Sequence, residues 1–195
     1  MRRRGLGRGP GCGGGLSRRR LRLSEPWSPP ARTPPVRSLD AIFWHQGAAR
    51  LDALHLVHPA RYAARYRMAG GPGTWYASSS EAAAWAELTR HAPDLPPGDL
   101  RPRLVARIRV AGLRVLDLTD PGTVAEVGLT AAELTNDEPE ALAALADLAA
   151  WAAAEGFQGL LAPSAAVPGE CTLVLFASGL AAITVEEERL SDPPR

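Results

Sequence analysis

The residues of this chain best suited to chemistry are a glutamate on a predicted helix and a serine that follows a predicted strand. Glu87 lies about two turns into a helix predicted for residues 79–91, and Ser164 follows a strand predicted for residues 158–162. A carboxylate stabilises positive charge that develops on a substrate, and a hydroxyl donates a hydrogen bond. Taken singly, Glu87 fits a solvated helix position equally well, and Ser164 fits an ordinary turn.

A second group of candidates precedes Glu87, around a glycine-rich turn at residues 70–73. Arg65 and Arg67 lie before this turn, and a guanidinium holds a phosphate through two hydrogen bonds. Glycine lets the backbone approach a ligand closely, and Tyr76, after the turn, can stack on a flat ring. The same residues also fit surface charge, a plain turn and a core aromatic.

Several motifs that would identify a reaction are absent. The sequence has no P-loop, no HExxH and no G-x-S-x-G. Its four histidines lack metal-ligand spacing, so we expect no metal. Of its two cysteines, one falls in the N-terminal tail and one in a predicted strand, so we expect no structural disulfide.

The pattern of apolar residues predicts a single mixed domain. Strands outnumber long helices and do not alternate regularly with them, which favours an α+β fold over a doubly wound sheet. Ser78 and Glu81 match a capping box at the start of the first helix. The predicted strands are 40–47, 74–77, 104–110, 113–118, 158–162, 171–177 and 181–186; the predicted helices are 79–91 and 139–156, with short helical pieces in 121–137.

The N-terminal stretch differs in composition from the rest. Residues 1–38 hold ten of the 22 basic residues and one of the 21 acidic residues, together with seven Gly and six Pro. We predict a disordered tail over residues 1–38 and a folded domain over residues 39–190. A nucleic-acid-binding or membrane-surface arm, or a translated leader with the true start near Val36, are the alternatives. Without an apolar run of signal-peptide or membrane length, the protein is expected in the cytoplasm.

Taken in order, these residues resemble the RES domain, a family named for its Arg, Glu and Ser and known as the toxin half of bacterial toxin–antitoxin pairs. Arg65 matches the family's arginine and Tyr66 its tryptophan. Tyr76, Glu87 and Ser164 match its tyrosine, glutamate and serine. The resemblance spans roughly residues 40–178 of the chain.

The resemblance implies an ADP-ribosyltransferase-like fold and an enzyme that consumes NAD⁺ by cleaving the nicotinamide–ribose bond, through hydrolysis or phosphorolysis. NAD⁺ is then the substrate, no metal is required, and the implied partner is an Xre-type helix-turn-helix antitoxin. The implied catalytic residues are Glu87, Tyr76 and Ser164, and the implied NAD⁺-binding residues are His45, Gly47, Arg65 and Arg67.

One position departs from the family pattern. The first strand of the family normally ends in an arginine, and here His45 occupies that place. A histidine binds phosphate as a cation only when it is protonated. Turnover should then rise as the pH falls through the histidine range, about 7 to 6. This departure motivates one alternative function, a catalytically weakened nucleotide-binding module. Transfer of ADP-ribose to a protein is a separate alternative within the enzyme class.

Overall fold

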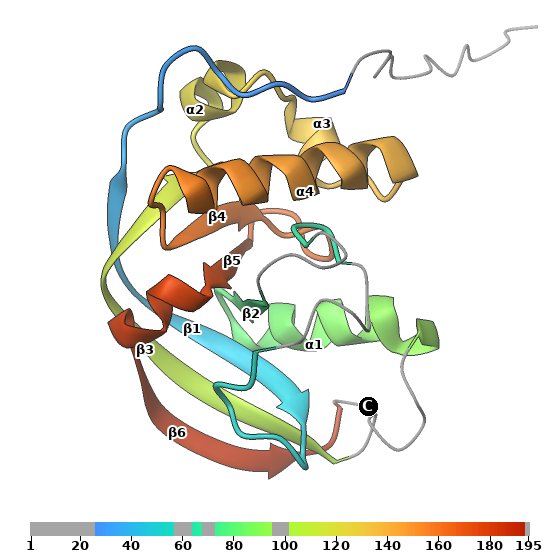
Figure 1. Ribbon diagram of the computed structural model, residues 1–195. Helices are drawn as coiled ribbons and strands as arrows, with labels where there is room; N and C mark the ends of the chain where they lie inside the picture. The colour runs from blue at the N-terminus through green and yellow to red at the C-terminus, as the bar shows by residue number, and fades with distance from the viewer. Residues whose placement is uncertain (1–25, 57–63, 68–72, 95–101, 194–195) are drawn as a thin grey trace, which may run out of the picture.

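The computed structural model describes residues 26–56, 64–67, 73–94 and 102–193, and these residues contain one six-stranded sheet (Figure 1). The strand order is β1-β2-β5-β4-β3-β6, and β1 also pairs with β3. These pairings join β1, β2, β5, β4 and β3 in a closed ring, and β6 pairs antiparallel with residues 103–110 of β3. The strands are β1 Arg37–Ala48, β2 Thr74–Ser78, β3 Arg103–Asp117, β4 Gly159–Pro163, β5 Cys171–Phe176 and β6 Ile183–Ser191.

The helices lie outside this ring. In Figure 1, α4 lies beside β4, α1 lies beside β2, and the short segment 64–67 lies between the two helices. The α+β class predicted from the sequence is confirmed. The helices are α1 Glu81–His91, α2 Pro121–Glu126, α3 Ala131–Leu134 and α4 Pro139–Ala154, with 3-10 turns at Ala92–Asp94 and Ala177–Ala182. Within the described ranges, no helix has the length and apolar character needed to cross a membrane.

Two strands predicted separately, 104–110 and 113–118, are a single strand. β3 stays paired with β1 from Arg103 to Val115, and the register shifts opposite Leu39 and Ala41. Gly112, with φ of +64°, absorbs this irregularity, and its N–H donates to the Asp40 carboxylate at 2.9 Å. The two predicted strands are therefore joined through a bulge at Gly112, because pairing with β1 continues past it.

The start of α1 also differs from the prediction. Its N-cap is Ser80, whose hydroxyl oxygen accepts the N–H of Ala83 at 3.1 Å. The predicted capping box is wrong, since Ser78 is still part of β2 and Glu81 is already the first helical residue. Glu81 instead accepts a hydrogen bond from Arg189 at 2.5 Å, which joins α1 to β6.

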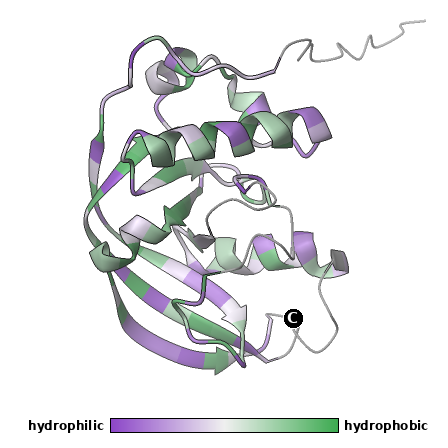
Figure 2. Ribbon diagram, viewed as in Figure 1, coloured by the Kyte–Doolittle hydropathy of each residue, from purple (hydrophilic) through white to green (hydrophobic). Residues whose placement is uncertain are grey.

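Hydrophobic side chains fill both faces of the central strands. Leu160 and Val174 are buried beneath α4, in the same cluster as Leu145 of that helix. Their neighbours along the same strands, Leu161 and Leu173, point into the other cluster with β1, β2 and β3. This alternation is the period of two that a strand imposes. Figure 2 shows hydrophobic colour along α4 and the central strands, whereas β6 is largely hydrophilic.

The folded domain begins before residue 39. The half-buried Trp27 packs on Trp151, with ring centroids 5.9 Å apart, and its indole N–H donates to the carbonyl of Val127 at 2.9 Å. The Thr33 hydroxyl donates to Glu155 at 2.7 Å. The predicted disordered tail over residues 1–38 is therefore too long, since residues 26–38 are bound to the domain; residues 1–25 lie outside the described residues. At the other end, β6 runs to Ser191, one residue past the predicted boundary.

Replacing Trp27 tests this attachment. Trp27→Ala is expected to lower the free energy of unfolding by about 2 kcal/mol, because it removes aromatic packing and one hydrogen bond. Trp27→Phe keeps most of the packing and should lose about half as much. Urea unfolding of the full chain measures both values. A disordered tail would give no loss in either variant.

Candidate functional site

The predicted glutamate and serine are in direct contact. The Ser164 hydroxyl donates to Oε1 of Glu87 at 2.8 Å, although the two residues are 77 positions apart. The N–H of Ala166 donates to the same carboxylate oxygen at 3.3 Å. Ser164 is 5% exposed, and the Glu87 side chain is 21% exposed. The fold thus creates a carboxylate that is mostly shielded from water and is already held by a hydroxyl.

The loop after β4 fixes the orientation of the serine hydroxyl. Its oxygen accepts the backbone N–H groups of Ala166 at 3.2 Å and Val167 at 3.1 Å. A hydroxyl has one proton to donate. Because the Ser164 oxygen accepts both N–H groups, that proton points at Glu87. The direction of the Ser164–Glu87 hydrogen bond is therefore set by the backbone.

A residue that the sequence analysis missed attaches the same loop to α1. The Glu170 carboxylate accepts hydrogen bonds from the hydroxyls of Ser79 and Ser80, the second at 3.1 Å. The carbonyl of Glu170 accepts the N–H of Ser164 at 2.8 Å. The loop is thus fastened to the N-terminus of α1 as well as to Glu87 further along the helix. No local motif marks Glu170, because its side-chain partners Ser79 and Ser80 lie 91 and 90 positions earlier in the chain.

Three buried hydroxyls belong to the segments around the predicted glycine turn, and the Tyr66 hydroxyl lies within reach of the charge of Glu87. Among the described residues, the hydroxyls of Tyr66, Thr74 and Tyr76 have no hydrogen-bond partner of ordinary geometry, although Thr74 and the backbone of Tyr66 lie close enough to the Tyr76 hydroxyl to lower its pKa against the larger effect of burial. Burial raises the pKa of Tyr76 and of Tyr66, and the charges of Arg65 and Glu87 both act on the pKa of Tyr66. The two phenols therefore stay protonated and can donate to a ligand, which would remove the cost of burying them without a partner.

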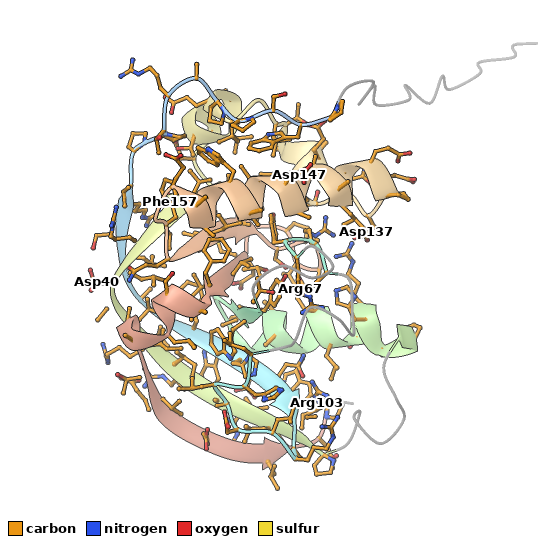
Figure 3. All side chains as sticks on the ribbon, in the orientation of Figure 1. Asp40, Arg67, Arg103, Asp137, Asp147 and Phe157 are labelled. Carbon is orange, nitrogen blue, oxygen red and sulfur yellow. The ribbon has the colours of Figure 1, made fainter. Side chains whose placement is uncertain are left out.

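The two predicted phosphate-binding arginines occupy different surroundings. Arg65 donates to the carbonyls of Leu134 at 3.2 Å and Asn136 at 2.6 Å, and to the carboxylate of Asp137 at 2.5 Å. Arg67 is 6% exposed and lies between α4 and α1 (Figure 3). Burial lowers its pKa, and the nearby phenol of Tyr76 opposes that effect. Residues 70–72 of the predicted glycine turn lie outside the described residues.

His45 holds the strand that carries Tyr76. Its Nδ1 lies 2.7 Å from the backbone carbonyl of Tyr76, and its ring stacks on Trp75 with centroids 4.6 Å apart. Burial lowers the pKa of His45 from 6.5 to about 4, against the opposing effect of the Tyr76 carbonyl; Arg103 lowers it further. A Cβ at Gly47 would come within 3.1 Å of Nε2. His45 is therefore neutral near pH 7, donates from Nδ1, and has its lone pair on Nε2 beside Gly47.

This protonation state removes the charge on which the expected phosphate contact depended. With the pKa near 4, no protonation occurs between pH 7 and 6. The expected rise in turnover over that range therefore has no physical basis in this structure. The neutral ring can still accept a hydrogen bond from a ligand hydroxyl or amide.

His45 makes the stability depend on pH. The unfolded chain takes up the His45 proton below about pH 6.5 and the folded protein only near pH 4. Stability is therefore lost as the pH falls through this window, by about 2 kcal/mol between pH 7.5 and 5. His45→Asn, whose amide can still donate to Tyr76, should lose less over the same range. Urea unfolding at both pH values measures the difference; equal losses in the two proteins would contradict the lowered pKa.

Comparison with known proteins places this geometry in a family. Residues 29–193 match the RES domain. Over 167 residues, which are 83% of this chain and 77% of the relative, the chain is 40% identical to a protein of Mycobacterium tuberculosis (strain ATCC 25618 / H37Rv) named "Probable NAD(+) phosphorylase". A chain in the crystal structure of the M. tuberculosis MbcT–MbcA toxin–antitoxin complex has the same fold, with a TM-score of 0.67 at 23% identity over 81% of this chain and 87% of that one.

Proposed function

Because this chain belongs to the RES domain family, we propose that it cleaves NAD⁺ at the bond between nicotinamide and ribose. The observation that carries the proposal is the hydrogen bond of 2.8 Å between Ser164 and Glu87, which holds a shielded carboxylate in a fixed orientation. The name of the 40%-identical mycobacterial relative supports the same substrate.

The cleavage develops positive charge on the ribose, because the pair of electrons of the broken bond leaves with nicotinamide. Glu87 would stabilise that charge through its negative oxygens, and its fixed position avoids reorganisation when the charge appears. Ser164 would keep the carboxylate in place. Its single proton is donated in the hydrogen bond to Glu87, so the direct contact with the nicotinamide-ribose side expected from the sequence is not assigned to it. Tyr76 would stack against the nicotinamide or ribose, with its buried hydroxyl as a further donor.

The remaining site residues would bind the rest of NAD⁺. Arg65 and Arg67 would contact the pyrophosphate, since guanidinium groups suit phosphate oxygens. We assign His45 a different contact from the one expected from the sequence: its Nε2 would accept from a ligand hydroxyl or amide. Gly47 would leave room for that contact, because a side chain there would lie 3.1 Å from Nε2.

We propose inorganic phosphate rather than water as the acceptor, following the phosphorylase named among the relatives. We further propose that the protein pairs with an antitoxin of the Xre type, a helix-turn-helix protein, which would block the site. The toxin–antitoxin complex with the same fold supports a partner of this general kind.

NAD⁺ consumption by the purified full chain tests this function. The assay is run with and without inorganic phosphate, and the products are identified by mass. Loss of NAD⁺ that depends on phosphate, with ADP-ribose recovered as a phosphate ester, is the expected result. Recovery of free ADP-ribose would indicate hydrolysis, and ADP-ribose on protein would indicate transferase activity. Binding of NAD⁺ without any turnover would indicate a nucleotide-binding module.

A further inference from the structure

Two guanidinium groups from distant parts of the chain converge on one exposed carboxylate. Nη2 of Arg65 lies 2.5 Å from Oδ1 of Asp137, and Nη2 of Arg90 donates to Oδ2 of the same residue. The side chains of Arg65 and Arg90 are 13% and 24% exposed, whereas that of Asp137 is 58% exposed. The cations are thus mostly enclosed, and the anion between them faces solvent. Figure 3 shows Asp137 at the N-terminal end of α4.

This cluster adjoins the proposed catalytic pair. Arg90 follows Glu87 by three positions on α1, so the two side chains are neighbours on the helix surface. Arg65 precedes Tyr66, whose buried hydroxyl has no partner among the described residues. The charges of Arg65 and Glu87 act on that hydroxyl in opposite directions, Arg65 lowering and Glu87 raising the pKa of Tyr66, which burial raises. An anion held by the two arginines would therefore lie near Glu87 and near a phenol able to donate to it.

We propose that Asp137 is an internal anion that holds Arg65 and Arg90 in the free protein and gives way to a phosphate group of the substrate. This inference rests on the proposed function, since NAD⁺ and inorganic phosphate both supply such a group. The fork of a guanidinium fits phosphate as well as carboxylate. A phosphate also carries more acceptor oxygens than the single carboxylate that it replaces.

The contacts of Arg65 show that Asp137 is not needed to place it. Two backbone carbonyls, those of Leu134 and Asn136, accept from Nη1 of Arg65 without any involvement of the carboxylate. An ion pair whose carboxylate faces solvent contributes little to stability, and the Asp137 side chain is 58% exposed. Removing the negative charge of Asp137 should therefore leave the fold intact and change mainly the affinity of the two guanidinium groups for an anionic ligand.

The chain offers a matched control at the other end of the sheet. Arg107 and Arg109 on β3 both pair with Glu186 on β6, at 2.5 Å in the case of Arg107. This cluster has the same composition, two arginines on one carboxylate. In Figure 1, β6 and the part of β3 that pairs with it, residues 103–110, lie away from α4 and the segment 64–67. Neutralising Glu186 changes the net charge of the protein by the same amount as neutralising Asp137.

Ligand affinity, measured without turnover, tests the inference. Calorimetric titration of NAD⁺ and, separately, of inorganic phosphate uses the full chain carrying Glu87→Gln. Asp137→Asn, Arg90→Gln and Glu186→Gln are added singly. Asp137→Asn should lower the Kd of the phosphate-bearing ligand about two- to fivefold at low salt, and Arg90→Gln should raise the Kd of the same ligand. Both effects should shrink at high salt because mobile ions screen exposed charges.

The choice of ligand separates the two phosphate sources. If only the Kd of NAD⁺ changes, Arg65 and Arg90 bind the pyrophosphate. If only the Kd of inorganic phosphate changes, they bind the acceptor. The inference is overturned when neither Kd responds to Asp137→Asn and Arg90→Gln, or when Glu186→Gln gives the same shifts. If Asp137→Asn fails to fold, Arg90→Gln decides by itself. NAD⁺ consumption by the wild-type chain is measured separately, so the proposed function can fail while the displacement of Asp137 by a phosphate group is still observed.

Discussion

Glu87→Gln is expected to lower kcat for NAD⁺ cleavage by about a hundredfold or more while the protein stays folded. The amide keeps the size of the side chain and still offers an oxygen to the Ser164 hydroxyl, which donates to Oε1 at 2.8 Å. It carries no negative charge, so it cannot stabilise the cation that forms when nicotinamide leaves. Loss of one such preorganised electrostatic group costs about 10² to 10³ in rate.

The matched control for this variant is on the same helix. Glu81→Gln changes the charge of α1 by the same amount, but its carboxylate pairs with Arg189 on β6. It should retain nearly all activity. NAD⁺ consumption and thermal unfolding are measured for both variants. A Glu87→Gln protein that is folded and works at the wild-type rate would refute the assignment of Glu87.

Ser164→Ala is expected to lower kcat by about tenfold to a hundredfold and to destabilise the protein by about 1–2 kcal/mol. Both effects come from one missing oxygen. The N–H groups of Ala166 and Val167 lose an acceptor, and Glu87 keeps the longer contacts of 3.3 Å to the N–H of Ala166 and 3.9 Å to Nε2 of His91. The carboxylate then has more freedom to move away from the position in which it stabilises the ribose.

A double variant distinguishes this positioning role from an independent one. If Ser164 acts through Glu87, Ser164→Ala should cost much less when Glu87→Gln is already present, because interacting residues are not additive. Ser178→Ala, on an exposed turn, is the control for a lost serine hydroxyl and should leave kcat unchanged. Full additivity of the two losses would show that Ser164 and Glu87 act separately.

Much of the candidate site follows from the sequence because its signals are local. The short apolar run before Ser164 predicts a buried strand, and the helix predicted over residues 79–91 places the Glu87 carboxylate on α1. The order of these residues also carries the family resemblance, which the match over residues 29–193 confirms. What the sequence predicted about each element depended only on its own neighbours.

Other features were decided by contacts between distant segments. Glu170 joins Ser79 across 91 positions, and Arg65 meets Asp137 across 72. Such pairings depend on which strands lie side by side, and a local pattern carries no information about that order.

The same reason explains the predictions that changed. An isolated histidine side chain has a pKa near 6.5, whereas burial in the fold, where the ring stacks on Trp75, lowers the pKa of His45 to about 4. Trp27 lies in a stretch whose composition indicates disorder, and only the surface of α4 gives it a place to pack. Sequence alone proposed which residues carry the chemistry; the tertiary structure decided the charge of His45, the partners of Glu87 and Ser164, and the packing of residues 26–38 on the domain.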